Sequence, residues 1–375
     1  MRMKLYRYLI ILLGIYSCQQ HHKKPLPYWV QEGFNLDNPQ PQLPAGFKEG
    51  YVLLSRRDEP GALYLLDANG KVAWYHQVNG TGFKTAHFTE KKTLLCILGG
   101  KEFPTSYGNE IMELSLSGDT LLHLKKGQND FIANAHHEVL LSPGNNIVLL
   151  STAEKQFDLS ARGGHDADTV RSDAILVLDR QGHKVWEWTV FDALDPREDK
   201  DILRTRMDWM HANSLSFDKD GNYLISFYNN GQIWKLDART GKIIWKFGRN
   251  GDFQLPDTAA FDMGHAVHRN ENGDLMLFDN GVSRQQSQVL AFHLDEASGK
   301  ATVTWRSQIP SYLFNDRMGS AYLVDHQYIL ACCSKRNTVL LTDKAGKLLW
   351  QLHCAFIPYR AEFISKALLP DFITH

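Results

Sequence analysis

Residues 208–248 read DWMHANSLSFDKDGNYLISFYNNGQIWKLDARTGKIIWKFG, and this stretch decides the fold. Apolar and polar residues alternate in four short runs, and turn residues at 220–222 and 239–241 separate them. Alternation with a period of two, bounded by Gly-bearing turns, is typical of antiparallel strands. The stretch therefore predicts four consecutive strands, with His211 before the first and Trp245 in the last.

The second half of this unit recurs along the chain as a hairpin with a Gly-bearing turn and, in most copies, a Trp. The copies are LYLLDANGKVAWYH from Leu63, IMELSLSGDTLLHL from Ile111, ILVLDRQGHKVWEW from Ile175, IWKLDARTGKIIWKF from Ile233, VLAFHLDEASGKATVTW from Val289 and VLLTDKAGKLLWQL from Val339. A predicted strand pair precedes each hairpin, at 46–55, 86–98, 135–151, 211–227, 265–279 and 320–334. Six four-stranded units at spacings of about 40–55 residues predict an all-β fold, a six-bladed β-propeller. Two β-sandwiches are the alternative, but they do not explain six similar units.

Composition excludes some classes of function. The chain has 41 Lys and Arg against 42 Asp and Glu. It therefore lacks the excess of basic residues that is typical of nucleic-acid-binding proteins. Cys96, Cys354 and the adjacent pair at 332–333 have no zinc-binding spacing, and buried thiols in strands are the better interpretation. This spacing disfavours a zinc site, and we predict no metal and no cofactor.

The first residues resemble a targeting segment. Arg2 and Lys4 precede an apolar run at 9–15 that is too short to span a membrane. The run ends in Ile-Tyr-Ser-Cys, which resembles a bacterial lipobox with Cys18 as the acylated residue; an ordinary secretory signal is the alternative. We expect a protein of the periplasm or cell envelope whose contact with a membrane is through this anchor. The predicted organisation is a lipoprotein-type signal at 1–18, a tether and lead-in at 19–43, the propeller at 44–360 and a tail at 361–375.

Three further segments have predicted roles. The charged insertions at 156–172 and 192–206 are expected to be surface loops that wall an entrance, with a short helix starting at Pro196. The tail from Phe356 is expected to add a last strand that helps to close the ring.

Histidines begin most of the predicted innermost strands, which line the channel of a propeller. Aligning the units places His87, His136, His211 and His265 in equivalent positions. Such a ring can bind a metal or an anion, or supply a nucleophile. Few carboxylates accompany it, which disfavours the metal. A single His at a strand start is often structural. For His87, a structural role and a functional role have equal weight.

Three motifs carry a resemblance to a known family. They are Asp-Trp-x-His-x-Asn-Ser at 208–214, Gly-His followed by Asn-Gly-Asp-Leu-Met-Leu-Phe-Asp-Asn-Gly at 264–281, and His-His-Glu at 136–138. Together they resemble the bacterial arylsulfate sulfotransferases over roughly residues 46–360. That resemblance implies a periplasmic six-bladed propeller. It also implies transfer of a sulfuryl group from a small phenolic sulfate ester to a phenol through a sulfohistidine, without a nucleotide donor.

The resemblance also implies roles for individual residues. His265 matches the histidine that receives the sulfuryl group, His211 the one that polarises the phenolic oxygen or moves its proton, and His136 a third that contacts sulfuryl oxygens. The predicted substrate-binding residues are Arg284, Asn213, His137, His87, Tyr228 and Asn229. The family has an Arg after the strand that ends here at Ser226, and this chain has Phe-Tyr-Asn-Asn instead. The alternative function is a non-catalytic propeller lipoprotein that binds an anionic ligand or an envelope protein.

Overall fold

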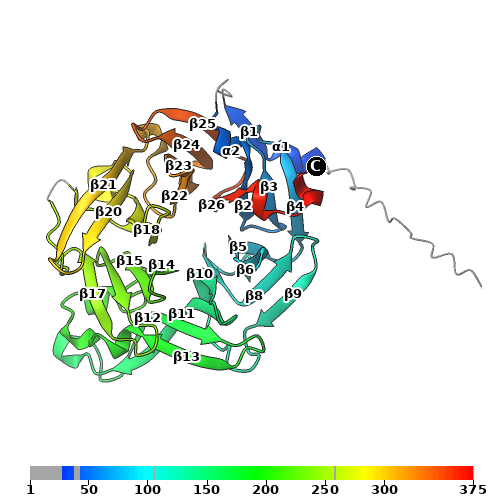
Figure 1. Cartoon of the computed structure of the whole chain (residues 1–375). Coiled ribbons are helices and arrows are strands. Elements are labelled where there is room, and N and C mark those ends of the chain that lie inside the picture. The colour runs from blue at the N-terminus through cyan, green and yellow to red at the C-terminus, as the bar shows by residue number, and fades with distance from the viewer. Residues whose placement is uncertain (1–27, 38–42, 105, 257–258, 375) are drawn as a thin grey trace, which may run out of the picture.

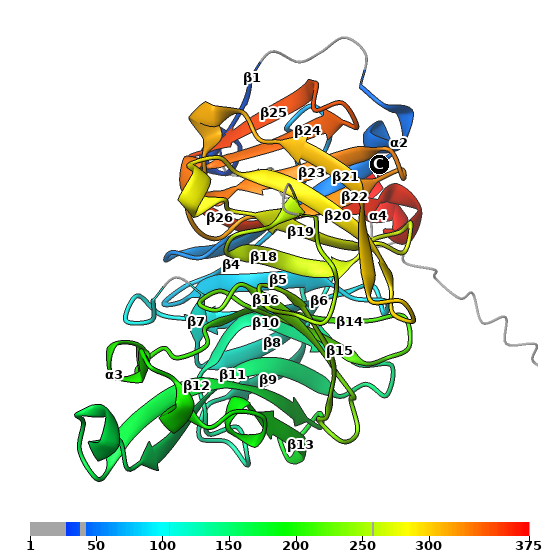
Figure 2. The ribbon, with the colours of Figure 1, turned by 90° about the vertical axis from the view of Figure 1, so that its left-hand side faces the viewer.

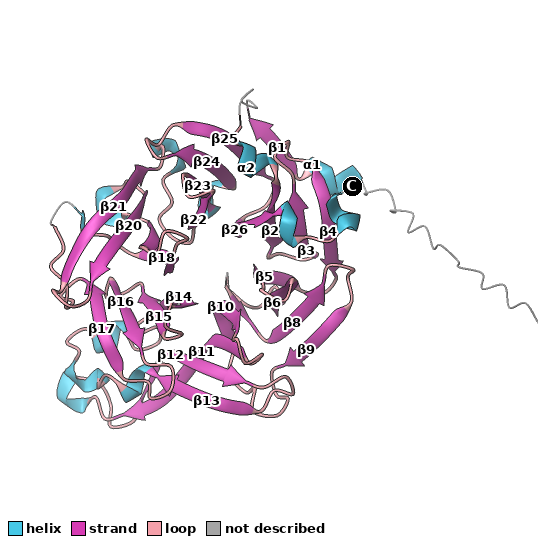
Figure 3. Cartoon of the chain, in the orientation of Figure 1, coloured by secondary structure: helices cyan, strands magenta, loops and turns pink. Residues whose placement is uncertain are grey.

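A computed structural model describes residues 28–37, 43–104, 106–256 and 259–374. Its strands form six antiparallel sheets arranged as the blades of a ring around a central channel (Figure 1). Strands dominate and the helices are short (Figure 3). The predicted six-bladed propeller is therefore confirmed.

The strands of each blade follow one another from the channel outward. Blade 1 contains β26 (Pro358–Ser365), β2 (Gly50–Arg56), β3 (Gly61–Leu66) and β4 (Val72–Val78). Blade 2 contains β5 (Gly82–Phe88), β6 (Thr93–Gly99), β8 (Glu110–Ser115) and β9 (Thr120–Lys125). Blade 3 contains β7 (Tyr107–Gly108), β10 (Ala135–Leu141), β11 (Ile147–Phe157), β12 (Asp168–Leu178) and β13 (Lys184–Thr189).

The second half of the ring has the same pattern. Blade 4 contains β14 (Ala212–Phe217), β15 (Tyr223–Phe227), β16 (Gln232–Leu236) and β17 (Ile243–Gly248). Blade 5 contains β18 (Gly264–Arg269), β19 (Leu275–Asp279), β20 (Gln288–Asp295) and β21 (Lys300–Gln308). Blade 6 contains β22 (Ser320–Val324), β23 (Tyr328–Cys333), β24 (Thr338–Asp343), β25 (Leu348–Cys354) and β1 (Phe34–Asp37).

The repeated hairpins are the outer two strands of blades 1 to 5, as the sequence pattern predicts, and in blade 6 the strand β1 adds one more strand outside the hairpin of β24 and β25. Their Trp residues link neighbouring blades, because several indole N–H groups donate to a backbone carbonyl in the next blade's outer turn. These bonds are Trp74 to Leu116 at 2.9 Å, Trp186 to Arg239 at 3.2 Å and Trp350 to Ala68 at 2.9 Å. Apolar side chains from facing sheets fill the spaces between blades.

Both ends of the described chain take part in closing the ring. The prediction that residues 46–55 supply the inner strand pair of blade 1 is wrong, because 45–48 form the short helix α2 (Ala45–Lys48). The innermost strand is β26, which pairs antiparallel with β2 from Gly50↔Ser365 to Arg56↔Pro358. The last strand expected from the tail is therefore present, and it runs past Arg360. On the other side, β1 adds an outer edge to blade 6.

The two insertions lie together beside blades 3 and 4. Residues 156–172 are not simply a loop, since β11 and β12 extend as a paired ribbon to Phe157↔Asp168. The ribbon and the segment with α3 (Ile202–Thr205) project from one side of the ring (Figure 2). They are joined by the Arg171 amide, which donates to the Arg206 carbonyl at 2.6 Å. The short helix expected at Pro196 is the 3-10 turn η3 (Pro196–Glu198).

The remaining helical elements are short and lie at the edges. They are α1 (Tyr28–Glu32), α4 (Asp371–Thr374), η1 (Ser160–Arg162), η2 (Val190–Asp192), η5 (Val282–Arg284), η6 (Ser311–Leu313), η7 (Ser334–Arg336) and η8 (Lys366–Leu368). Over the described ranges, no helix combines the length and apolar character needed to cross a membrane. The expected buried thiols at 96, 332, 333 and 354 are confirmed. Cys18 and the rest of the proposed signal lie outside the described residues.

Candidate active site

Bulges in the innermost strands bring side chains together at one end of the channel. The pairing of β10 with β11 shifts directly after His136, and that of β18 with β19 directly after His265. Inside these bulges, His137 and Ala266 have φ of 56° and 54°. Bulges of this kind redirect side chains and recur beside functional sites. His136 and His265 therefore occupy matching positions in blades 3 and 5.

The other two aligned histidines do not share this position, so the predicted register is wrong for them. His211 lies one residue before β14, where it has a φ of 56° and its carbonyl accepts the Tyr228 amide at 3.0 Å. His87 lies near the far end of β5, paired with Leu95. Phe83 pairs near the start of that strand instead. The bulges change the residue count between the strand start and the turn, which a pattern of alternation does not reveal.

The three proposed catalytic histidines nevertheless converge through a chain of rings. Ring centroids are 5.0 Å apart for His136 and His137, and 5.3 Å apart for His137 and His211. Tyr228 continues the chain, with its ring 5.4 Å from His211 and 5.5 Å from His265. His137 and Tyr228, both expected to bind substrate, are thus the links between the other three.

Hydrogen bonds fix the tautomer of His265. The Asn280 amide nitrogen donates to the carbonyls of Asn315 and Met318 at 2.6 and 2.9 Å, so its oxygen faces His265. That oxygen lies 2.6 Å from Nδ1, which must therefore carry the proton. Nε2 accepts the Met318 amide at 3.2 Å. The unprotonated nitrogen is thus Nε2, in a residue that is only 3% exposed.

Burial keeps His265 neutral. Desolvation lowers the pKa of His265 to about 3, and the positive charge of Arg360 acts in the same direction, while the bond to Asn280 opposes them. Burial likewise lowers the pKa of His136 to about 4 and that of His137 well below 6.5. These three imidazoles therefore offer lone pairs rather than positive charge at neutral pH.

His211 has the opposite character. Its Nδ1 lies 2.7 Å from a carboxylate oxygen of Asp208. Burial acts to lower the pKa of His211, but the hydrogen bond and charge of Asp208 outweigh it and raise the pKa above 6.5. Asp173 adds negative charge nearby, and burial raises its own pKa to about 6. His211 is therefore the imidazole in the ring chain best able to hold and release a proton.

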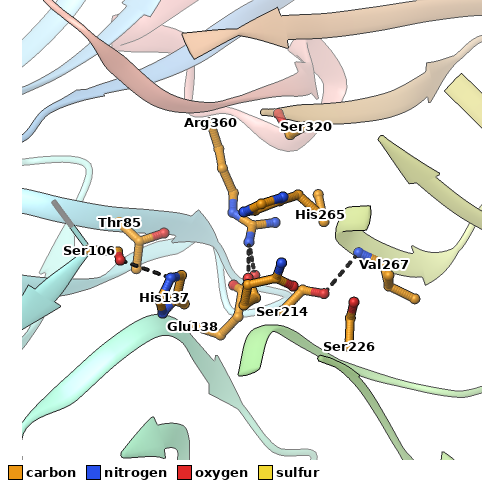
Figure 4. Close-up of polar contacts among 12 residues, drawn as sticks. Thr85, Ser106, His137, Glu138, Ser214, Ser226, His265, Val267, Ser320 and Arg360 are labelled. Atoms are coloured by element: carbon orange, nitrogen blue, oxygen red, sulfur yellow. Dashed lines mark hydrogen bonds and ion pairs between the residues drawn. The ribbon is translucent and has the colours of Figure 1, made fainter. Parts of the chain in front are cut away.

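A network of charges lies beneath the histidines, in the body of the channel. The Arg360 guanidinium pairs with Glu138, and Figure 4 shows it reaching across from β26 beside His265. The other Glu138 oxygen lies 2.7 Å from Nε2 of His87, and His87 Nδ1 pairs with Glu362. Burial opposes protonation of His87, but the two carboxylates raise its pKa to about 10. Two cations thus balance two carboxylates, which makes His87 a structural residue.

Three predicted substrate-binding residues have protein partners instead. The Arg284 guanidinium pairs with Asp279 and donates to the Ala260 carbonyl at 3.4 Å. The Asn213 amide donates to the Gly264 carbonyl at 2.8 Å, which ties β14 to the strand that carries the nucleophile candidate. The Asn229 amide donates to the carbonyls of Asp208 and Trp209 at 2.7 and 3.3 Å, and so holds the segment before His211.

Two residues that shape the site are not predicted as site residues from the sequence. The pattern around Asn280 indicates only a turn, although its side chain orients His265. Arg360 belongs to no motif, because the tail lacks the repeat pattern that reveals the other blades. Its position on a strand expected to close the ring is the available signal. No cluster of three or more His, Cys, Asp or Glu suited to a metal occurs in the part of the chain that the structure describes.

Comparison with known proteins identifies the class. The profile of the family described as Arylsulfotransferase (ASST) matches residues 37–314, which is most of the chain. The protein therefore belongs to the arylsulfotransferase family and is a sulfotransferase-like enzyme. A search of curated proteins finds no match.

One solved structure supports the fold alone, and a second is a more distant match. A Bacteroides caccae protein of unknown function superposes with a TM-score of 0.53 at 12% identity, covering 84% of this chain and 99% of that one. The β-propeller domain of Cps50 (Swd1) from Myceliophteria thermophila gives a TM-score of 0.47 at 12% identity, covering 88% of this chain and 89% of that one.

Proposed function

We propose that the protein moves a sulfuryl group from a phenolic sulfate ester to a phenol, with His265 as the covalent carrier. The observation that carries this proposal is the fixed tautomer of His265. A neutral imidazole with its lone pair on Nε2 and its proton held on Nδ1 is the form in which histidine acts as a nucleophile.

In the first half-reaction, the Nε2 lone pair attacks sulfur and the bond from sulfur to the phenolic oxygen breaks. The electron pair leaves with the phenolic oxygen, which takes a proton from His211. The product imidazole carries the sulfuryl group on Nε2 and the proton on Nδ1. Asn280 stabilises the positive charge that develops on this ring, since its oxygen accepts the Nδ1 proton.

In the second half-reaction, an acceptor phenol gives its proton to His211 and its oxygen attacks the sulfur. The bond from sulfur to Nε2 breaks and the lone pair returns to His265. The same site carries out both half-reactions, and no nucleotide takes part. The Met318 amide, which lies 3.2 Å from Nε2, moves aside for sulfur and then has a sulfuryl oxygen within reach.

The test is transfer of the sulfuryl group from 4-nitrophenyl sulfate to phenol, measured as the release of nitrophenolate. We expect activity in the wild-type protein, loss of it in His265→Ala, and a sulfuryl group on His265 when the acceptor is omitted. The matched control is His326→Ala, an exposed histidine bonded to Asn272. Undiminished transfer by His265→Ala would refute the mechanism.

Ligand binding without transfer is the competing function, and the Met318 amide on Nε2 favours it. A wild-type protein that binds aryl sulfates but transfers nothing, with any acceptor phenol, would establish that alternative.

We propose in addition that Cys18 anchors the protein to a membrane of the cell envelope. Metabolic labelling with a radioactive fatty acid should mark the wild-type protein and not Cys18→Ala. Equal labelling of the two would exclude acylation at this residue.

A further inference from the structure

One wall of the channel mouth faces the histidine and tyrosine rings of the site. This wall comes from blade 1, where Arg57 directly follows β2. Its place is defined by register. Arg56 pairs with the first residue of β26, as Phe227 pairs with the first residue of β14. Arg57 therefore stands in blade 1 where Tyr228 stands in blade 4, at the same end of the channel.

Met318 links the Arg57 side chain to the candidate nucleophile. Its Nη1 lies 3.9 Å from the sulfur of Met318, the residue whose amide contacts Nε2 of His265. On its other side, Arg57 is close enough to Tyr359 for the phenol to influence its pKa. The Tyr359 ring lies 6.3 Å from that of His137. Arg57 thus lies between Met318, which contacts His265, and Tyr359, whose ring is near His137.

Among the residues that the structure describes, Arg57 has no partner for its charge. Its Nε is buried and makes no hydrogen bond, and within the described ranges no carboxylate lies within 4.0 Å of its guanidinium. Burial lowers the pKa of Arg57, and Asp58 opposes this only at longer range. A half-buried guanidinium without a counter-ion is costly, and a bound anion would remove that cost.

A second cation strengthens the positive character of this wall. Lys84 is on β5, within the bulge of that strand, and is 4% exposed. Its ammonium donates to the Gly100 carbonyl at 3.1 Å, and no described carboxylate lies within ion-pair distance. The backbones of the two segments are in contact, since a Cβ on Gly82 would come within 1.8 Å of the Arg57 carbonyl oxygen. Burial lowers the pKa of Lys84 and the nearby charge of Arg57 acts in the same direction, while Asp58 and Glu102 oppose them. Blades 1 and 2 thus place two cations without an ion-pair partner among the described residues near one another, whereas blades 3 to 5 supply imidazoles.

We propose that Arg57 binds the anionic sulfo group of the substrate and presents its sulfur to His265, with Lys84 adding a second positive charge. This inference rests on the proposed function. The guanidinium offers parallel N–H donors that match two oxygens of a sulfo group, while the third oxygen faces the Met318 amide. The arginine that the sequence lacks after Ser226 is thereby supplied from a different blade.

The experiment measures binding of 4-toluenesulfonate, an anion that carries the sulfo group but cannot transfer it, by calorimetric titration. We expect Arg57→Met to raise the Kd at least about tenfold, Arg57→Lys to raise it less, and Arg239→Met, an exposed arginine in an outer turn, to leave it unchanged. Circular dichroism and the thermal midpoint verify folding of each variant. Equal Kd values for Arg57→Met and wild type, or no binding by wild type, would overturn the inference.

Transfer assays separate this inference from the proposed function. Binding that depends on Arg57 in a protein that transfers no sulfuryl group supports the anion site and refutes the transferase. If Arg57→Met transfers the sulfuryl group with an unchanged KM for the donor, the transferase is supported and the anion site at Arg57 is refuted.

Discussion

The Arg360 side chain, on the last strand of the propeller, forms a buried ion pair with Glu138 on blade 3. The two residues hold equivalent places in their strands. Glu138 lies two residues after His136 and Arg360 two residues after Pro358, and the strand pairing shifts register directly after His136 and after Pro358. The pair therefore joins blades that are distant along the chain. Arg360 also donates to the Asn213 carbonyl at 3.1 Å, so three blades meet at one guanidinium.

Breaking this pair should strongly destabilise the protein. We expect Arg360→Met to lower the free energy of unfolding by about 3–5 kcal/mol, because Glu138 remains buried with only His87 as its counter-charge. The double variant with Glu138→Gln should lose less than the sum of the single variants. Urea denaturation measures these values. The control is Arg171→Met, whose exposed pair with Glu154 should contribute about 1 kcal/mol or less. Equal losses for the two arginines would contradict the prediction.

Removing the Asn280 side chain should release the tautomer of His265. We expect Asn280→Ala to reduce transfer about tenfold or more, because Nδ1 no longer has a fixed acceptor. In Asn280→Asp the carboxylate should raise the pKa of His265 from about 3. Nitrogen NMR of labelled histidine reports both the tautomer and the pKa. Unchanged ring signals in Asn280→Ala would show that Asn280 does not set the tautomer.

The rate of transfer should fall at alkaline pH as His211 loses its proton. Asp208 raises the pKa of His211, so the falling limb lies above pH 6.5 in the wild-type protein. We expect Asp208→Asn to shift that limb to lower pH, since the uncharged amide no longer favours the imidazolium. Initial rates between pH 5 and 10 check this. A limb that stays in place would exclude His211 as the proton donor.

Stability should also depend on pH through His87. The pKa of His87 is about 10 in the folded protein, against 6.5 for an ordinary histidine. The folded state thus binds the proton more tightly, so the contribution of His87 is complete below pH 6.5 and is lost as pH rises toward 10. Unfolding midpoints in urea at pH 6 to 10 should fall in wild type and vary less in His87→Gln. A parallel decline in both proteins would argue against a charged His87.

The Trp hydrogen bonds between blades can be measured with a matched pair. Trp350 and Trp305 are both buried on outer strands, but only the Trp350 indole donates to a carbonyl, whereas Nε1 of Trp305 has no hydrogen-bond partner among the described residues. Replacement by Phe should therefore be more destabilising at 350 than at 305, by about 1 kcal/mol. Denaturation of the two variants gives the difference. A larger loss at 305 would assign the effect to packing.

The fold is predictable because its signal is local and repeated. Every outer hairpin has its Gly-bearing turn and its apolar strands within a short stretch, and six copies make the period visible. The inner strands are less predictable. A bulge adds residues to one strand without changing its alternation, which is why the repeat pattern places His87 and His211 level with His265.

The site is predictable in part for the same reason. His136, His211 and His265 lie in recognisable motifs, and the structure brings them into one chain of rings. Arg360 and Arg57 lie in no motif, because the position of each is set by the pairing of β26 with β2, strands from opposite ends of the chain. A contact of that kind depends on ring closure, and no local pattern in the sequence specifies it.

The position of β26 has a consequence for biosynthesis. A ribosome makes β1 and the three outer strands of blade 1 early, then the remaining strands of the other blades, and only afterwards the strand that holds Tyr359, Arg360 and Glu362. Until that strand docks, Glu138 and His87 have no counterparts from blade 1, and the channel is open along one side. A nascent chain can therefore form most of its blades and still lack a working site, so activity begins only when synthesis has passed this strand.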